Sequence, residues 1–188
     1  TSDESIKDKL ELIKNQVNRI AKIIRDLVDF SRPSAYIIRS TDVNQVVREA
    51  LSIVQYGKKV HGITFQIELD DALPPLQVVP DQLSQVFINI LMNAVDSLEG
   101  KPGTIAVRSV TKGDRVVVTV SDSGRGISED NREKIFEPFF TTKEVGRGTG
   151  LGLWVSYGIV KNFDGDILLE STPGKGSTFT VVLPRTGE

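Results

Sequence analysis

The sequence predicts an α+β fold, a two-layer α/β sandwich with a mixed, mainly antiparallel sheet, preceded by one long N-terminal helix. Three observations support this prediction. Apolar residues recur at heptad spacing over residues 6–27. Helical and strand patterns are interspersed along the rest of the chain. Two pairs of neighbouring strand patterns are joined by short glycine-containing turns, which indicates antiparallel hairpins.

The N-terminal segment carries a helical seam whose apolar residues are alternately four and three positions apart. They are Ile6, Leu10, Ile13, Val17, Ile20, Ile24 and Leu27. A seam of this kind packs against other helices. Ser31-Arg32-Pro33-Ser34 ends the helix, because proline disfavours helical geometry in the residue before it. We therefore expect two units, residues 1–34 and residues 35–188.

The second unit begins with a helix and a strand. Thr41 or Asp42 can cap a helix whose apolar residues between Val43 and Val54 share one face. In residues 63–69, isoleucine, phenylalanine and leucine alternate with polar residues, and this alternation predicts a strand. Both elements have one apolar face, as expected for a sandwich.

A second helix and a hairpin follow. Pro74-Pro75 interrupts the pattern, and Asp81 is the expected N-cap of a helix that runs to about Leu98. Residues 104–121 predict a hairpin with its turn at Lys112-Gly113-Asp114.

The C-terminal part starts with a long loop-like stretch, Ser123–Arg147, that contains one short helical piece, Glu129–Phe136. Loops of this length are uncommon unless they have a function. A helix over about Gly150–Asn162 and two strands, Asp166–Glu170 and Thr178–Leu183, complete the predicted fold.

Composition excludes several classes of function. The 188 residues are 39% hydrophobic and 26% charged, with a net charge of −2, so we expect no nucleic-acid partner. The absence of cysteine excludes disulfides and thiol catalysis and fits a cytoplasmic location. No apolar run approaches the ~18 residues of a transmembrane helix.

Two asparagines mark the helix that ends near Leu98. Asn89 and Asn93 are four residues apart and therefore share a face. Amides among apolar neighbours are costly without partners, so we expect them to face a ligand, with one carbonyl oxygen on a hard cation such as Mg²⁺. Taken alone, the pair also fits surface amides on an amphipathic helix.

Three glycine-rich segments follow. In Asp122-Ser-Gly124-Arg-Gly126, a carboxylate at a strand end can accept a hydrogen bond from the exocyclic amine of adenine, although this is also common turn chemistry. Gly146-Arg-Gly-Thr-Gly-Leu-Gly152 leads into a helix, and backbone N–H groups at a helix N-terminus bind phosphate. Gly174-Lys-Gly-Ser-Thr178 places a hydroxyl near the base or forms a simple hairpin turn.

Together these segments resemble the catalytic, ATP-binding domain of sensor histidine kinases, in the nitrogen-regulation-type form. That domain belongs to the Bergerat-fold superfamily shared with DNA gyrase and heat-shock chaperones. Gln85–Asp96 is similar to the asparagine box, and Asp122–Gly126 and Gly146–Leu153 are similar to two glycine boxes. Phe136-Glu-Pro-Phe-Phe-Thr-Thr-Lys143 resembles the phenylalanine box. The match covers residues 42–185.

The resemblance implies ATP and Mg²⁺ as cofactors. It implies that Asn93 coordinates Mg²⁺, that Asn89 assists at the phosphates, that Asp122 holds the adenine amine, and that residues 127–149 form a lid. The catalytic residues it implies are Asn89 and Asn93. The full set of implied nucleotide-binding residues is Asn89, Asn93, Asp96, Asp122, Gly124, Gly126, Ile127, Lys143, Arg147, Gly148, Thr149, Gly150, Leu151, Gly152 and Thr178. Asp96 stands where many relatives have a basic residue.

Residues 1–34 resemble the second helix of the family's dimerisation domain. The first helix, which carries the phosphorylated histidine, is missing, and His61 precedes Gly62 at the start of a strand, so it is not the expected acceptor. The resemblance implies a histidine-bearing dimerisation helix and a response-regulator receiver domain as partners, and a homodimeric full-length protein. It leaves open whether that protein is anchored to a membrane.

The chemistry implied is transfer of the γ-phosphate to a histidine. Superfamily ATPases have a glutamate where this sequence has Asn89, and an amide cannot act as a general base near neutral pH. Two alternatives stay open: a protein serine kinase of the anti-sigma-factor type, and a nucleotide-dependent interaction module without transfer activity.

Overall fold

The computed structural model describes residues 6, 7, 9–11, 13, 14, 16, 17, 20, 21, 24, 37–57, 60–143 and 148–185. The described residues between positions 6 and 24 are helical, as predicted. Their six seam residues, from Ile6 to Ile24, are all more than half exposed. Leu27 and the predicted end of the helix at residues 31–34 lie outside the described residues.

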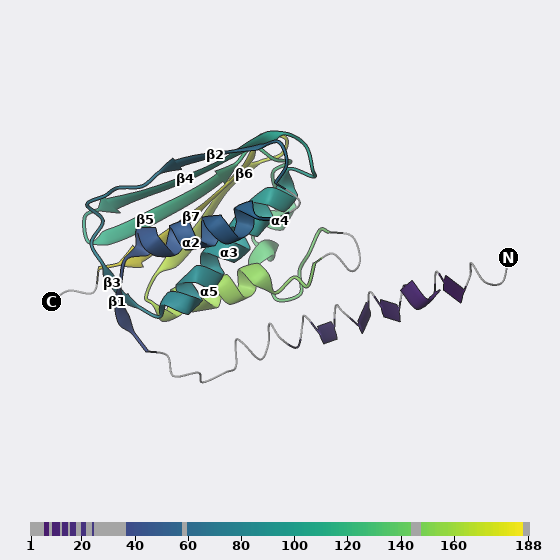
Figure 1. Cartoon of the computed structure of the whole chain (residues 1–188), viewed down its shortest axis with the longest axis horizontal. Coiled ribbons are helices and arrows are strands. Elements are labelled where there is room, and N and C mark those ends of the chain that lie inside the picture. Colours follow the sequence, from purple (N-terminus) through teal and green to yellow (C-terminus); the bar gives the residue numbers. More distant parts are fainter. Residues whose placement is uncertain are drawn as a thin grey trace.

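The described part of residues 37–185 is a two-layer sandwich with helices on one face of a sheet (Figure 1). In spatial order the strands of the larger sheet are β2 (Ile63–Glu68), β4 (Gly103–Lys112), β5 (Arg115–Asp122), β7 (Gly176–Pro184) and β6 (Asp166–Thr172). Only the β2–β4 pair is parallel. The predicted mixed, mainly antiparallel sheet is confirmed.

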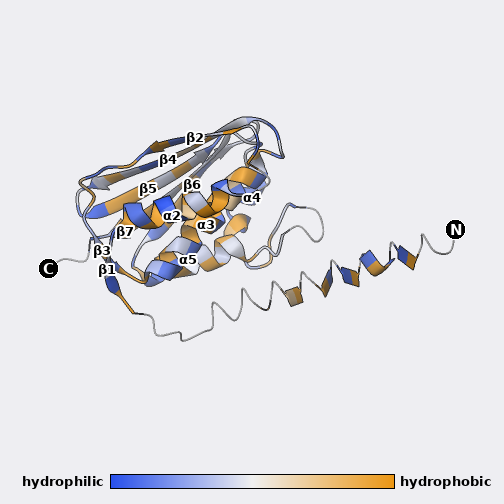
Figure 2. Cartoon of the chain, in the orientation of Figure 1, coloured by the Kyte–Doolittle hydropathy of each residue, from blue (hydrophilic) through white to orange (hydrophobic). Residues whose placement is uncertain are grey.

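The helical layer consists of α2 (Val43–Gln55), α3 (Pro80–Ser97) and α5 (Gly152–Asn162), and α3 packs against both other helices. Each of these helices carries hydrophobic and hydrophilic residues, coloured orange and blue (Figure 2). Their apolar faces and the facing side of the sheet form one core that includes Phe87, Ile90 and Leu91 of α3. This packing fixes α3 beside the end of β5, where the site lies.

The entry into α2 follows the prediction. Asp42 is the N-cap, and its carboxylate accepts a hydrogen bond of 3.1 Å from the backbone N–H of Gln45. This bond satisfies one of the free donors of the first helical turn.

The structure differs from the sequence prediction at several places. A second, two-stranded sheet pairs β1 (Arg39–Thr41) with β3 (Leu76–Val78), and neither strand was predicted. The expected N-cap of α3 at Asp81 is wrong: the cap is Val79, and Pro80 follows it. Proline suits the first helical position, since its fixed φ is helical and its missing N–H would have no partner there.

The connection between β5 and α5 holds two short helices in place of the single predicted piece. They are α4 (Glu129–Arg132) and the 3₁₀ helix η1 (Lys134–Phe136). The helix α5 begins at Gly152, two residues after the predicted start. Residues 144–147 lie outside the described part of the chain.

Candidate functional site

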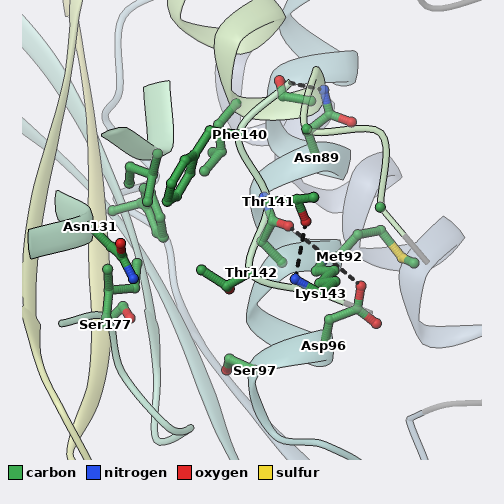
Figure 3. A pocket seen from close by; sticks show the side chains of 18 of the residues that line it. Asn89, Met92, Asp96, Ser97, Asn131, Phe140, Thr141, Thr142, Lys143 and Ser177 are labelled. Atoms are coloured by element: carbon green, nitrogen blue, oxygen red, sulfur yellow. Dashed lines mark hydrogen bonds and ion pairs between the residues drawn. The ribbon is translucent and has the colours of Figure 1, made fainter. Parts of the chain in front are cut away.

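A cavity of about 620 Å³ opens between α3, the end of β5 and the described parts of the β5–α5 connection. This volume lies within the range of about 300–1,000 Å³ that is typical of small-molecule sites. Asn131 and Ser177 lie on one side of the cavity, whereas Asn89, Asp96 and Lys143 lie on the opposite side (Figure 3). The cavity therefore has polar groups on two facing walls.

Asp122 lines the cavity and is only 8% exposed. Its Oδ1 accepts hydrogen bonds from the Ser97 hydroxyl at 2.7 Å and from the Gly124 N–H at 2.9 Å. Burial raises the pKa of Asp122, and the hydrogen bonds from Ser97, Gly124 and the backbone of Ser177 oppose that rise. A buried carboxylate held in this way is a fixed acceptor for a ligand's hydrogen-bond donor.

Two glycines near Asp122 are required by close packing. A Cβ at Gly124 would lie 2.1 Å from the Ser97 hydroxyl oxygen. At Gly126, whose φ is +70°, a Cβ would lie 2.2 Å from the carbonyl oxygen of Thr172. Gly124 lets the chain leave β5 close to Ser97 of α3, and Gly126 lets it pass close to the backbone of Thr172 at the end of β6.

The exposed face of α3 presents a row of polar side chains to the cavity. The Asn89 amide donates to the carbonyl oxygen of Gly152 and to the Ser156 hydroxyl, both at 3.2 Å. Asn93 Oδ1 accepts a hydrogen bond of 3.1 Å from Lys143 Nζ. These contacts tie α3 to the start of α5 and to the segment that ends at Lys143.

The described glycines of the second cluster shape the cavity beside α5. Gly150 has a φ of +70°, and a Cβ there would lie 2.3 Å from the backbone carbon of Phe139. At Gly152 a Cβ would lie 3.6 Å from Asn89 Cγ. No side chain caps α5 at Leu151. A helix N-terminus without a side-chain cap attracts anions such as phosphate, because backbone N–H groups and the helix dipole both favour them.

Most of the residues that the sequence predicted for the site line this one cavity. They are Asn89, Asn93, Asp96, Asp122, Gly126, Ile127, Lys143, Gly148, Thr149, Gly150 and Gly152. Arg147 lies outside the described residues. The cavity thus brings together residues that are far apart in sequence: Asn89 and Gly152, 63 positions apart, are in direct contact.

Three predicted positions do not line the cavity. Gly124 instead allows the close approach of the chain to Ser97, and Leu151 is buried in the protein. Thr178 pairs its hydroxyl with that of Ser121 at 2.8 Å, and its neighbour Ser177 lines the cavity instead. In the β5–β7 register Ser177, not Thr178, lies opposite Asp122.

The sequence analysis missed several residues that line the cavity, among them Ser97, Asn131, Phe140, Thr142 and Ser177. Ser97 could have been found from the sequence, because it lies four residues after Asn93 and therefore on the same face of α3. Asn131 lies in the four-residue helix α4, and Thr142 lies in an irregular part of the β5–α5 connection. Neither segment has a periodicity that indicates which side chains face inward.

The donor set fits a hard cation only together with a ligand that brings its own oxygens. Among the described residues, no group of three or more histidine, cysteine, aspartate or glutamate side chains could hold a metal ion. Asn93 and Asp96 offer oxygens, and Mg²⁺ is usually held by one or two such groups plus substrate phosphates. The cavity, the buried acceptor and the open N-terminus of α5 fit an adenine nucleotide with Mg²⁺.

Within the described ranges, every helix is too short or too polar to cross a bilayer.

Comparison with known proteins identified related sequences. The family described as histidine kinase-, DNA gyrase B-, and HSP90-like ATPase matches residues 78–187. Sporulation kinase E of Bacillus subtilis is 36% identical over 173 residues, which is 92% of this chain and 23% of that protein. The sensor histidine kinase ZraS of Escherichia coli is 35% identical over 93% of this chain and 37% of its own length. The chain thus spans between 23% and 37% of the length of these two relatives.

Solved structures of histidine kinases are similar to this chain as well. The nucleotide-free catalytic domain of histidine kinase ThkA has a TM-score of 0.69 at 32% identity, covering 79% of this chain and 95% of that chain. ThkA in complex with the response regulator TrrA has a TM-score of 0.76 at 28% identity, covering 96% of this chain and 52% of that chain.

Proposed function

This chain belongs to the family of histidine kinase-, DNA gyrase B- and HSP90-like ATPases, and on that premise we propose that residues 35–188 bind Mg-ATP and transfer its γ-phosphate to a histidine of a partner dimerisation domain. The resemblance of the sequence to sensor histidine kinases is confirmed by these relatives. ThkA in complex with a response regulator supports a receiver domain as the next partner.

The proposed roles follow from the geometry of the cavity. Asp122 accepts a hydrogen bond from the adenine amine, because its carboxylate lines the cavity and is held in place by hydrogen bonds from Ser97 and Gly124. Asn93 holds the Mg²⁺ that neutralises the phosphates. The N-terminus of α5 and Lys143 supply positive charge around the triphosphate.

Asn89 is the single observation that favours transfer over hydrolysis. Its amide is committed to Gly152 and Ser156 as a hydrogen-bond donor, and it has no proton-accepting group for water. A neutral imidazole needs no such base, since its nitrogen lone pair is already available. What the domain has to supply is positioning and charge neutralisation.

The remaining parts of the proposal concern the rest of the protein. We propose that residues 1–34 are the second helix of a dimerisation domain, which agrees with the exposed seam from Ile6 to Ile24. The full-length protein is then a homodimer, with the acceptor histidine on a preceding helix. Its need for ATP places the reaction in the cytoplasm.

The test is transfer in trans. The chain is mixed with a separately produced histidine-bearing helical domain, γ-labelled ATP and Mg²⁺, and we expect acid-labile, base-stable phosphate on the partner. Asn93→Ala should abolish the label, whereas Asn162→Ala, a matched change at the exposed far end of α5, should not. Acid-stable label would indicate a serine kinase, and bound ATP without any label would indicate an interaction module.

A further inference from the structure

Asn131 is a polar residue of the cavity wall to which the proposed function gives no role. It lies half-buried in α4, lines the cavity, and is on the same side of it as Ser177 (Figure 3). Within the described part of the chain its side-chain amide has no hydrogen-bond partner, whereas its backbone N–H donates to the carbonyl oxygen of Ser128. The amide is therefore free to bind a ligand, as a donor and as an acceptor.

Hydrogen bonds on both sides of Asn131 hold its segment against the strands of the base site. The guanidinium of Arg132 donates to the carbonyl oxygen of Ser171 in β6. The hydroxyl of Ser171 accepts a hydrogen bond of 2.8 Å from the backbone N–H of Ile127 and lies 3.0 Å from the hydroxyl of Ser177. The segment from Ile127 to Arg132 is thus tied at both ends to one residue, which positions Asn131 near Ser177.

The position of Ser177 places Asn131 at the end of the cavity that we assign to the base. Ser177 pairs with Asp122 across β5 and β7, and Asp122 is the proposed acceptor for the adenine amine. The residues proposed for the phosphates lie on the other side, where Asn89 and Lys143 face Asn131 across the cavity (Figure 3). A nucleotide that spans the cavity therefore turns its nucleoside toward Asn131, and not its phosphates.

The side-chain chemistry of Asn131 complements that of Asp122. A carboxylate only accepts hydrogen bonds, so Asp122 can bind the adenine amine but none of the acceptor atoms of the nucleoside. These acceptors are the ring nitrogens of adenine and the ribose hydroxyls. An amide NH₂ is a donor for such atoms, and asparagine side chains bind adenine in this way in other proteins.

We infer that Asn131 is a further nucleotide-contacting residue, whose amide NH₂ donates a hydrogen bond to a ring nitrogen of adenine or to a hydroxyl oxygen of the ribose. The inference rests on the proposed function and deepens it. Asp122 then recognises a donor of the nucleoside and Asn131 recognises an acceptor, so that two residues from separate elements determine which nucleoside the cavity prefers.

Calorimetric titration of ATP into the wild type and two variants tests the contact. We expect Asn131→Ala to weaken ATP binding about three- to tenfold, the usual effect of losing one hydrogen bond. Asn131→Asp should weaken it at least as much, because it replaces the donor by an acceptor of the same shape. Asn162→Ala, a matched change at the exposed end of α5, should bind ATP like the wild type.

Thermal unfolding without nucleotide separates a ligand contact from a structural role. Asn131→Ala should keep the wild-type melting temperature, since no hydrogen bond within the described part of the protein depends on the Asn131 side chain. Alanine also favours the helical conformation of α4.

Analogues of ATP that each lack one acceptor identify the atom that Asn131 contacts. They are 2′-deoxy-ATP, 3′-deoxy-ATP and the 1-deaza, 3-deaza and 7-deaza forms of ATP. The analogue that lacks the contacted atom should bind the wild type and Asn131→Ala equally, because the hydrogen bond is already missing. Each of the other analogues should lose the same factor as ATP when Asn131 becomes alanine. A deoxy analogue would thus assign the contact to the ribose, and a deaza analogue to the base.

The inference would be wrong if Asn131→Ala or Asn131→Asp bound ATP as tightly as the wild type. It would also be wrong if Asn131→Ala weakened all of these analogues by the same factor, since Asn131 would then shape the cavity without contacting the nucleoside. Failure of the proposed function gives a different result, because the wild type itself would not bind ATP. Tight ATP binding by the wild type and by both variants would leave the nucleotide site in place without a role for Asn131.

Discussion

Asp122→Asn should change which base the site prefers. In the structure Ser97 and Gly124 both donate to Asp122 Oδ1, so an asparagine keeps these two bonds with its own oxygen. Its NH₂ group then replaces Oδ2, so the side chain offers a donor where the carboxylate offered an acceptor. The adenine amine is a donor and would meet another donor, whereas guanine and hypoxanthine present a carbonyl oxygen at that position.

The size of the effect follows from burial. At 8% exposure the new NH₂ group has little water to bind when adenine fills the cavity, so both donors lose a partner. An unsatisfied buried donor costs about 1–3 kcal/mol, and two of them together cost about 2–4 kcal/mol after partial relaxation. We therefore expect ATP affinity to fall about 30- to 1,000-fold. ITP affinity should fall far less or rise.

Isothermal titration calorimetry with ATP and ITP in EDTA separates the base from the metal. Asp114→Asn is the matched control, because Asp114 is 84% exposed in the hairpin turn at the opposite end of β5. A reversal or collapse of the ATP-to-ITP ratio confirms the assignment. If Asp122→Asn kept the wild-type ratio, Asp122 would not be the group that recognises the base.

Three further outcomes are expected. Because the pKa of Asp122 is raised above 3.8, its stabilising contribution is present below pH 3.8 and is lost as the pH rises through the folded-state pKa. Denaturant unfolding without nucleotide should therefore show Asp122→Asn gaining stability over the wild type as the pH rises above 3.8 and through the folded-state pKa of Asp122. A difference that does not depend on pH would contradict this. Asn89→Glu should retain ATP binding but release phosphate faster in a steady-state assay, with a stability loss of about 1–3 kcal/mol because Gly152 loses its donor. Unchanged phosphate release would count against the hydrolysis argument. Gly150→Ala should lower the melting temperature more than Gly113→Ala does. Both have positive φ, but a Cβ at Gly113 meets nothing within 4 Å, whereas at Gly150 it meets the Phe139 backbone.

Sequence patterns predicted the long elements because their periodicity depends on burial of one face. The five strands of the main sheet and the three helices of the opposite layer were expected from such patterns, and the Asp42 cap was expected from local chemistry. The strands β1 and β3 were missed because three residues carry no readable alternation. The N-cap of α3 was placed at Asp81 because the N1 preference of Pro80 was overlooked.

The site was predictable where one helix or one turn carries the residues. Asn89, Asn93 and Asp122 lie in such local motifs, and all three line the cavity. Partnerships across the fold were not predictable. The contact between Lys143 and Asp96 joins residues 47 positions apart, and the contact between Ser97 and Asp122 depends on how closely α3 approaches β5. Whether Ser177 or Thr178 lines the cavity depends on the strand register, which composition does not reveal.

The order of strands has a consequence for synthesis on the ribosome. β7 is made after every other strand of its sheet, yet it lies between β5 and β6 and pairs with both. Until Gly176–Pro184 leaves the ribosome, β5 has an open edge, β6 has no partner strand, and Asp122 lacks its neighbour Ser177. The nascent chain therefore carries unpaired strand edges of the kind that promote aggregation. A premature stop or cleavage before residue 176 would leave β5 and β6 without the strand that joins them, so the residues of β7 decide whether the nucleotide site forms at all.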